Sequence, residues 1–152
     1  MKITLNQDPA FEDTEVIINC PQVDEDILRM AAMLRVANQK MTGTLDGDIH
    51  IVDAKDILYI DTVDKKTFFY TAGAVYESTL RLYEMEDVLR GMDFFRASKS
   101  SIVNFLKIRS IRPDFGGRLT LTMENGEQLS VSRQYAAVLR EKLDALERRT
   151  KS

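Results

Sequence analysis

The pattern of apolar and polar residues changes near residue 43. Ahead of this point, residues 15–20 form a β-branched run that predicts a short strand. Apolar side chains then repeat every three to four positions, and Asp24 occupies the place expected for a helix N-cap. This spacing predicts one amphipathic helix over residues 24–40, closed by Gly43. We therefore expect residues 1–42 to form a strand–helix extension, whose helix packs on the core or contacts a second copy of the chain.

Beyond residue 43 an alternation of period two predicts a series of short strands. They are expected around residues 49–51 and at 57–63, 67–71, 75–79, 101–105, 108–111, 118–123 and 128–132. Helical spacing predicts a short helix that ends at Gly91 and a C-terminal helix over 134–146. Asp46-Gly47 is typical of a tight turn, and Asn125-Gly126 predicts a type I′ hairpin. The expected fold class is α+β: mainly short antiparallel strands, with a few helices around them.

Composition and charge narrow the class of protein. The 152 residues suit one domain, and Cys20, the only cysteine, cannot form an internal disulfide. Neither a signal peptide nor an apolar run long enough to cross a membrane is present, so we expect a cytoplasmic protein. The net charge of −3 conceals an asymmetry, because residues 1–90 carry 9 basic and 17 acidic side chains, and residues 91–152 carry 12 and 7. The C-terminal part can therefore present a positive face to a polyanion.

Catalytic patterns are not found in this sequence. His50 is the only histidine, and its place in an alternating strand favours a structural role over a Ser-His-Asp or Cys-His pair. Asp46, Asp48 and Asp53 lack the spacing of a calcium loop, and no glycine-rich phosphate-binding motif occurs. We expect no catalytic residues, no metal ligands and no cofactor, so an enzyme is not predicted; an esterase-like activity at His50 is a distant alternative.

Three polar loops carry the chemistry that is present. In the first, Lys65 and Lys66 separate two predicted strands. The second, after two aromatic residues, holds Arg96, Ser98, Lys99 and Ser100, and in the third Arg133 and Gln134 lie where a strand meets a helix. Lysine and arginine neutralise phosphates or bind guanine, and serine hydroxyls bind phosphate oxygens or base edges. These loops are therefore candidate nucleic-acid contacts.

Several sequence blocks point to one family. They are ILYID at 57–61, DKKTFFYT at 64–71, YESTLRLYEMEDVL at 76–89, FFRASKSSIVNFLKIRSI at 94–111 and LTLTMENGEQLSVSRQY at 119–135. Together they resemble the LytTR family of bacterial DNA-binding domains, in order and over about residues 43–147. The resemblance implies a LytTR-type DNA-binding domain over 43–152, built as an array of antiparallel strands that binds DNA through loops in successive major grooves. It also implies that the three loops above are the DNA-contacting ones.

The sequence departs from the usual pattern of this family in two places. Many members have a histidine in the second loop, then Arg or Lys, Ser and an aromatic residue, whereas this chain has Ser98-Lys99-Ser100-Ser101, so a different base preference is expected. Many members also carry an N-terminal receiver domain, for which residues 1–42 are too short. The chain thus resembles stand-alone LytTR regulators, which often act with a small membrane protein.

Two hypotheses follow from these observations. The first is a sequence-specific transcriptional regulator that binds double-stranded DNA as a homodimer on paired half-sites about one helical turn apart. Arg133 and Lys99, then Lys65 and Lys66, are the expected base contacts, and phosphate contacts or loop supports are expected from Arg96, Arg118 and Ser100. The alternative is a protein-interaction module that uses the helix at 24–40 with a membrane or regulatory partner. Opposite faces for Lys65, Lys99 and Arg133 would exclude the first hypothesis.

Overall fold

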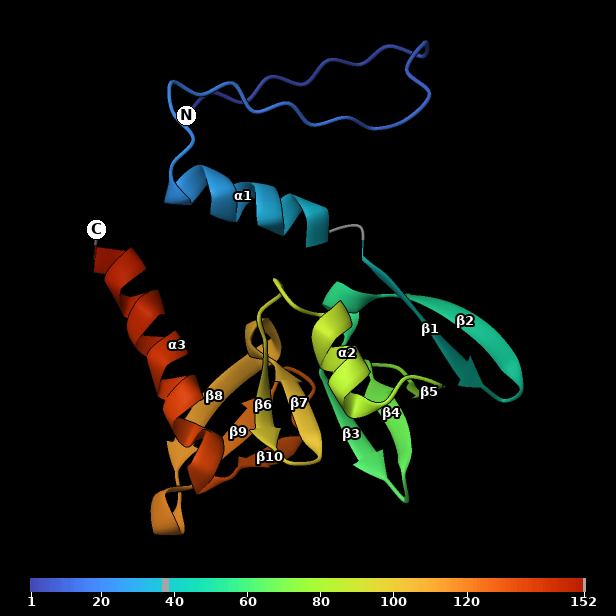
Figure 1. The fold of residues 1–152 in the computed structure, drawn as a ribbon, viewed down its shortest axis with the longest axis vertical. Helices are drawn as coiled ribbons and strands as arrows, with labels where there is room; N and C mark the ends of the chain where they lie inside the picture. Colours follow the sequence, from blue (N-terminus) through green and yellow to red (C-terminus); the bar gives the residue numbers. More distant parts are fainter. Residues whose placement is uncertain (37–38, 152) are drawn as a thin grey trace.

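The computed structural model describes residues 1–36 and 39–151, and within them ten strands form two antiparallel sheets (Figure 1). The larger sheet has the order β2-β1-β5-β4-β3-β7-β6, and the smaller has the order β10-β9-β8. The strands are β1 (Lys40–Leu45), β2 (Asp48–Asp53), β3 (Tyr59–Val63), β4 (Lys66–Tyr70), β5 (Val75–Ser78), β6 (Phe94–Ser98), β7 (Ser101–Asn104), β8 (Ile108–Pro113), β9 (Leu119–Met123) and β10 (Gln128–Val131). The helices are α1 (Glu25–Val36), α2 (Leu82–Val88) and α3 (Arg133–Lys151), and the short 3-10 turns are η1 (Ala54–Asp56), η2 (Phe105–Lys107) and η3 (Phe115–Gly117). The predicted α+β class is confirmed.

The alternation of period two divides apolar residues between two cores. On β3, Tyr59 belongs to one core and its neighbour Ile60 to the other. On β7, which pairs with β3, Val103 and Ile102 are divided in the same way. Since successive strand residues face opposite sides of a sheet, β3 and β7 serve both cores. One core is closed by α2, with Met85 fully buried, and the other by the small sheet and α3.

The N-terminal segment departs from the prediction in three respects. Residues 15–20 form no strand, because no strand among the described residues offers them backbone hydrogen bonds. Asp24 is the N-cap of α1, as predicted, and its Oδ1 accepts a hydrogen bond from the Ile27 N–H at 2.9 Å. The helix ends at Val36, however, and residues 37 and 38 of its predicted last turn lie outside the described residues. Lys40 begins β1, which pairs with β2 along six residues.

Gly43 therefore lies in a strand and does not close a helix. A Cβ placed on Gly43 would lie 2.5 Å from Cζ of Phe69 and 2.6 Å from Cβ of Tyr76. The absence of a side chain lets both aromatic residues pack against the β1 backbone. The predicted tight turn at Asp46-Gly47 is present between β1 and β2, with φ of 51° and 85°.

Two further predictions concerning strands and turns are corrected. Residues Phe94–Ser98, expected as an aromatic anchor followed by a loop, form strand β6, which pairs with β7. The hairpin at Asn125-Gly126 is not type I′, because Gly126 has a positive φ (91°) and Asn125 does not. The Gly126 N–H instead donates to the Met123 carbonyl at 2.9 Å, as in a type I turn followed by a glycine bulge.

Candidate nucleic-acid interface

The first two polar loops meet at one end of the larger sheet. Asp64 and Lys65, with φ of 50° and 67°, form the two-residue turn between β3 and β4. The turn between β6 and β7 lies beside it, because the Thr62 N–H donates to the Ser100 carbonyl at 2.9 Å. One backbone hydrogen bond thus joins two turns that are more than thirty residues apart in the sequence.

The third polar loop reaches the same end of the molecule. The Ser132 N–H donates to the Ala97 carbonyl at 2.9 Å, so the junction of β10 and α3 lies against β6. Arg133 is the first residue of α3, directly after this bond. All three loops lie toward the lower end of the view in Figure 1. The segments that carry Lys65, Lys99 and Arg133 are thus linked by backbone hydrogen bonds at this end of the molecule.

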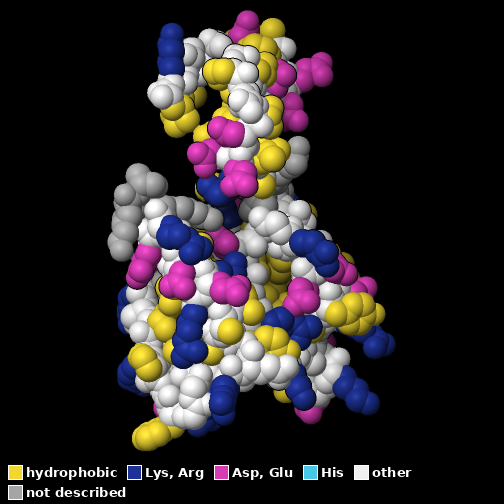
Figure 2. Space-filling model, turned by 60° about the vertical axis from the view of Figure 1, so that its left-hand side comes forward, with side chains coloured by type: hydrophobic (Ala, Val, Ile, Leu, Met, Phe, Trp, Pro, Cys, Tyr) yellow, Lys and Arg dark blue, Asp and Glu magenta, His cyan; other side chains and the backbone are white. Residues whose placement is uncertain are grey.

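Lys65, Lys99 and Arg133 are exposed and carry no ion pair to another described residue. Lys66 is also exposed, and its Nζ lies 3.8 Å from Oε1 of Glu77, a distance at which pairing is weak. Figure 2 shows Lys and Arg side chains over the lower part of the molecule, where these loops lie. The cations of the three loops are therefore available to a polyanion.

Arg96 and the serines of the second loop stabilise the turn. Arg96 Nε donates to Oε2 of Glu86 at 2.6 Å, and its Nη1 donates to the carbonyl of Lys99 at 2.8 Å. The Ser98 hydroxyl lies 2.7 Å from that of Ser101 and accepts the Ser100 N–H at 3.2 Å. These contacts leave Lys99 as the outward-pointing cation of the loop. Arg96 and Ser98 consequently act as loop supports in the unbound protein.

The remaining predicted residues flank the third loop. Gln134 is exposed in the first turn of α3. Arg118 is exposed after η3, and its Nε donates to the Phe115 carbonyl at 3.2 Å. The η3 loop lies against the third polar loop, since a Cβ built on Gly117 would be 3.1 Å from Cγ of Arg133. Arg118 therefore joins the same cluster, although the loop that carries it is a fourth one.

A partly buried polar network joins the two sheets. Tyr59 and Tyr70 stack with ring centroids 4.2 Å apart; the Tyr59 hydroxyl donates to Glu127 Oε2 at 2.7 Å, and the Tyr70 hydroxyl donates to Asp61 Oδ1 at 3.0 Å. Burial raises the pKa of the Tyr59 hydroxyl, and it raises the pKa of Tyr70 to about 12, with the Asp61 carboxylate adding to the effect. Burial also raises the pKa of Asp61, against the lowering effect of the Tyr70 hydrogen bond. This network links β3 and β4 of the larger sheet to the β9–β10 turn of the smaller one.

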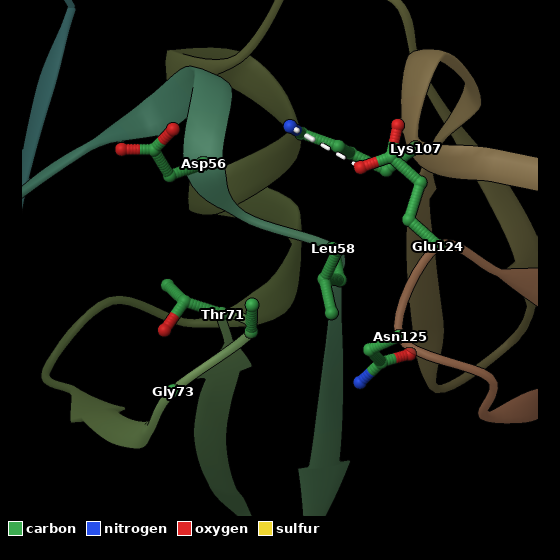
Figure 3. Close-up of a pocket in the computed structure, with 8 residues that line it drawn as sticks. Asp56, Leu58, Thr71, Gly73, Lys107, Glu124 and Asn125 are labelled. Atoms are coloured by element: carbon green, nitrogen blue, oxygen red, sulfur yellow. Dashed lines mark ion pairs between the residues drawn. The ribbon is translucent and has the colours of Figure 1, made fainter.

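The pocket in Figure 3, of about 400 Å³, offers no catalytic arrangement. It lies between the start of β3 and the β9–β10 turn, and neither histidine nor cysteine lines it. Lys107 is paired with Glu124 at 3.6 Å, and the Thr71 hydroxyl lies 3.3 Å from the carbonyl of Ala74. The pocket thus lacks a nucleophile next to a base.

Among the described residues, no group of three histidine, cysteine or carboxylate side chains is gathered as a metal site would require. Within the same residues, none of the helices has the length and apolar character needed to span a bilayer. His50 lies in β2, with its ring 5.5 Å from that of Tyr76, which agrees with the structural role predicted for it.

A family model described as the LytTr DNA-binding domain matches residues 47–144. The chain belongs to the LytTR family. Among solved structures, the LytTr DNA-binding domain of a methyl-accepting/DNA response regulator from Bacillus cereus is 30% identical. It superposes with a TM-score of 0.66 over 70% of this chain and 97% of that one. The chain therefore carries a LytTR DNA-binding domain, in agreement with the sequence resemblance.

Two curated LytTR relatives differ in how much of their length the chain covers. The sensory transduction protein LytT of Bacillus subtilis is 32% identical over 80% of this chain, which spans about half (51%) of that protein. An uncharacterised HTH-type transcriptional regulator of Staphylococcus aureus is 25% identical over 94% of this chain and 98% of its own length. Its name refers to a helix-turn-helix, whereas the matched LytTR region of this chain is mainly strands and turns.

The sequence analysis missed two residues at this end of the LytTR domain. Phe115 and Arg112 are exposed beside Arg118, and neither was singled out. A signal was present in the sequence Asp114-Phe115-Gly116-Gly117, where an aromatic residue stands among turn residues. The resemblance assigned no loop to this position, so the signal was not used.

Proposed function

We propose that this LytTR protein is a sequence-specific transcriptional regulator that binds double-stranded DNA through turn-borne side chains in the major groove. The observation that carries the proposal is the convergence of Lys65, Lys99 and Arg133, unpaired within the described chain, at one end of a rigid sheet assembly. Arginine and lysine bind the guanine edge in the major groove, and the remaining cations neutralise phosphates. The regulator acts where the chromosome is, in the bacterial cytoplasm.

The domain organisation follows from the same proposal. Residues 43–152 form the DNA-binding unit, and residues 1–42 form an extension that brings two copies together on paired half-sites. Exposed apolar side chains on α1 support a contact of this kind, since Leu28 and Met33 are 60% and 64% exposed. The alternative, an interaction module held or released by a small membrane protein, would use the same side chains.

The first experiment selects duplexes from a randomised library and measures their binding by fluorescence anisotropy. Lys99→Ala and Arg133→Ala are each expected to cost about 1–3 kcal/mol of binding free energy and to relax specificity at one base position. Two exposed cations outside the three loops are the controls, Lys55→Ala in η1 and Arg148→Ala near the C-terminal end of α3, and both should bind as the unmodified protein does.

Three outcomes would contradict parts of this proposal. Equal affinity for selected and scrambled duplexes would refute sequence-specific binding. Equal losses in the control variants and in Lys99→Ala would refute the assignment of the interface. Moving the second half-site by 5 base pairs turns it to the opposite face of the duplex. If the affinity of the protein for the duplex does not change, the paired-site arrangement is refuted.

A further inference from the structure

Phe115 is an aromatic side chain that the fold holds in solvent. It lies in η3, the connection between β8 and β9, and 85% of its surface is exposed. Large aromatic side chains normally bury much of their area, and Phe115 is the most exposed phenylalanine or tyrosine among the described residues. Exposure of one ring is not by itself evidence of a partner, so the loop and the surroundings of the ring are what indicate one. Figure 1 places this connection at the same lower end as the three cationic loops.

The exposure of Phe115 is built into the loop. Oδ1 of Asp114 accepts the Phe115 N–H at 2.7 Å, and its Oδ2 accepts the Thr120 hydroxyl at 3.0 Å. From the other side, Arg118 donates from Nε to the Phe115 carbonyl at 3.2 Å, and the Asp114 N–H donates to the Arg118 carbonyl at 2.9 Å. Gly116 adopts a φ of 69°, which lets the chain turn back directly after the ring. The ring is therefore presented by a closed, hydrogen-bonded loop.

The surroundings of the ring are cationic. Arg133 packs against Gly117, and the guanidinium groups of Arg112 and Arg118 lie close enough to Asp114 to contribute to lowering the pKa of its carboxyl group. Hydrogen bonds from Phe115 and Thr120 make the larger contribution to that lowered pKa, so Asp114 stays ionised. Two arginines act on this one carboxylate, and Arg133 lies next to the same loop at Gly117. An apolar ring within net positive charge fits a partner that combines anionic groups with apolar faces. Duplex DNA has both, in its phosphates and in its bases.

We propose that Phe115 is a DNA-contacting residue. Its ring makes an apolar contact with bases next to those that Arg133 contacts in the groove. The inference rests on the proposed function and adds to it a fourth loop and a contact that is not ionic. Phenylalanine makes such contacts with thymine methyl groups and with partly unstacked base steps. Because the contact neutralises no phosphate, it releases no counterions, and its contribution to affinity does not depend on salt.

The salt dependence of binding separates this contact from an ionic one. On the duplex selected by the unmodified protein, Phe115→Ala should weaken binding about tenfold at every salt concentration, with an unchanged slope of log affinity against log salt. Phe115→Leu should recover part of the loss, because it retains an apolar side chain. Arg118→Ala should instead reduce the slope by about one unit. Tyr83→Ala, at an exposed aromatic residue of α2 (60%), is the matched control and should change neither quantity.

Each remaining outcome decides against a particular statement. If Arg133→Ala weakens binding and Phe115→Ala does not, the inference about Phe115 fails while the proposed function stands. A changed salt slope in Phe115→Ala would overturn the inference, because it would mean that the ring only positions neighbouring cations. A changed oligomeric state of this variant without DNA would also overturn it, because the ring would then make a protein contact. If the unmodified protein prefers no duplex, the proposed function itself has failed. Unchanged thermal unfolding of Phe115→Ala, expected for an exposed side chain, excludes misfolding as the cause.

Discussion

Asn104 provides the most direct test of how the end of β7 is fixed to the segments beside it. Its side chain is 3% exposed at the end of β7; Nδ2 donates to the carbonyl of Ile57 at 2.9 Å, and Oδ1 accepts the N–H of Leu106 at 3.1 Å. Asn104→Ala removes both hydrogen bonds and leaves the carbonyl of Ile57, a fully buried residue, without the donor Nδ2 of Asn104. Leaving the Ile57 carbonyl without its donor costs about 1–3 kcal/mol, and the lost hydrogen bond from Leu106 costs about 0.5–1.5 kcal/mol more.

We therefore expect Asn104→Ala to lower the free energy of unfolding by about 2–4 kcal/mol, which for a chain of this size lowers the melting temperature by roughly 5–15 °C. Urea denaturation followed by circular dichroism measures the first quantity, and a thermal scan measures the second. Asn125→Ala is the control, because Asn125 lies in an exposed turn, and its loss should stay below about 1 kcal/mol.

Asn104→Asp refines the same test. The new carboxylate still accepts the Leu106 N–H, but it cannot donate to Ile57 unless it is protonated. Its folded-state pKa is expected to be raised, so the variant should regain stability as the pH falls. Losses below about 1 kcal/mol in Asn104→Ala, or equal losses in Asn125→Ala, would refute the reasoning.

Three further predictions follow from contacts described above. Gly43→Ala should lower the free energy of unfolding by about 1–3 kcal/mol, because the added methyl group overlaps the ring of Phe69; a urea titration would contradict this if the midpoint stayed constant. Tyr70 should titrate near pH 12 when followed by absorbance at 295 nm. Because its pKa is raised above the unfolded value of about 10, its contribution to stability is present below pH 10 and is lost as the pH rises toward 12. Tyr70→Phe should remove that part of the loss of stability at alkaline pH. Arg96→Ala removes the hydrogen bonds to Glu86 and to the β6–β7 turn, so the turn should become less ordered and DNA affinity should fall. The loss of order should appear as faster hydrogen exchange at residues 98–101 in the unbound protein. Unchanged exchange would show that Arg96 does not support the turn.

Local sequence signals predicted much of the fold because they act over a few residues. The alternation of period two predicted the strands from β3 to β5 and from β7 to β10 within a few residues of their observed ends. The Asp24 cap and the Asp46-Gly47 turn were also predicted, since each depends on one side chain or one backbone preference.

The wrong predictions concern segments whose state depends on distant neighbours. Residues 15–20 have the composition of a strand, yet no strand lies beside them, and a strand without a partner has unpaired backbone groups. Strand β6 was expected as a loop because Arg96 and Ser98 are polar. Both side chains find partners across the turn or on α2, and β7 supplies the pairing that makes the segment a strand.

The positions of the turns, the alternating strands and the identity of the cationic side chains could be read from the sequence, because these depend on short-range backbone preferences and on residue chemistry. The tertiary structure alone decided that Lys65, Lys99 and Arg133 share one end of the molecule. Backbone hydrogen bonds between Thr62 and Ser100, and between Ala97 and Ser132, join turns that are remote in the chain. The same long-range packing brings the η3 loop against Arg133, so that Phe115 becomes a neighbour of the cationic loops. Such juxtapositions arise from the order of strands in the two sheets, which no local pattern encodes.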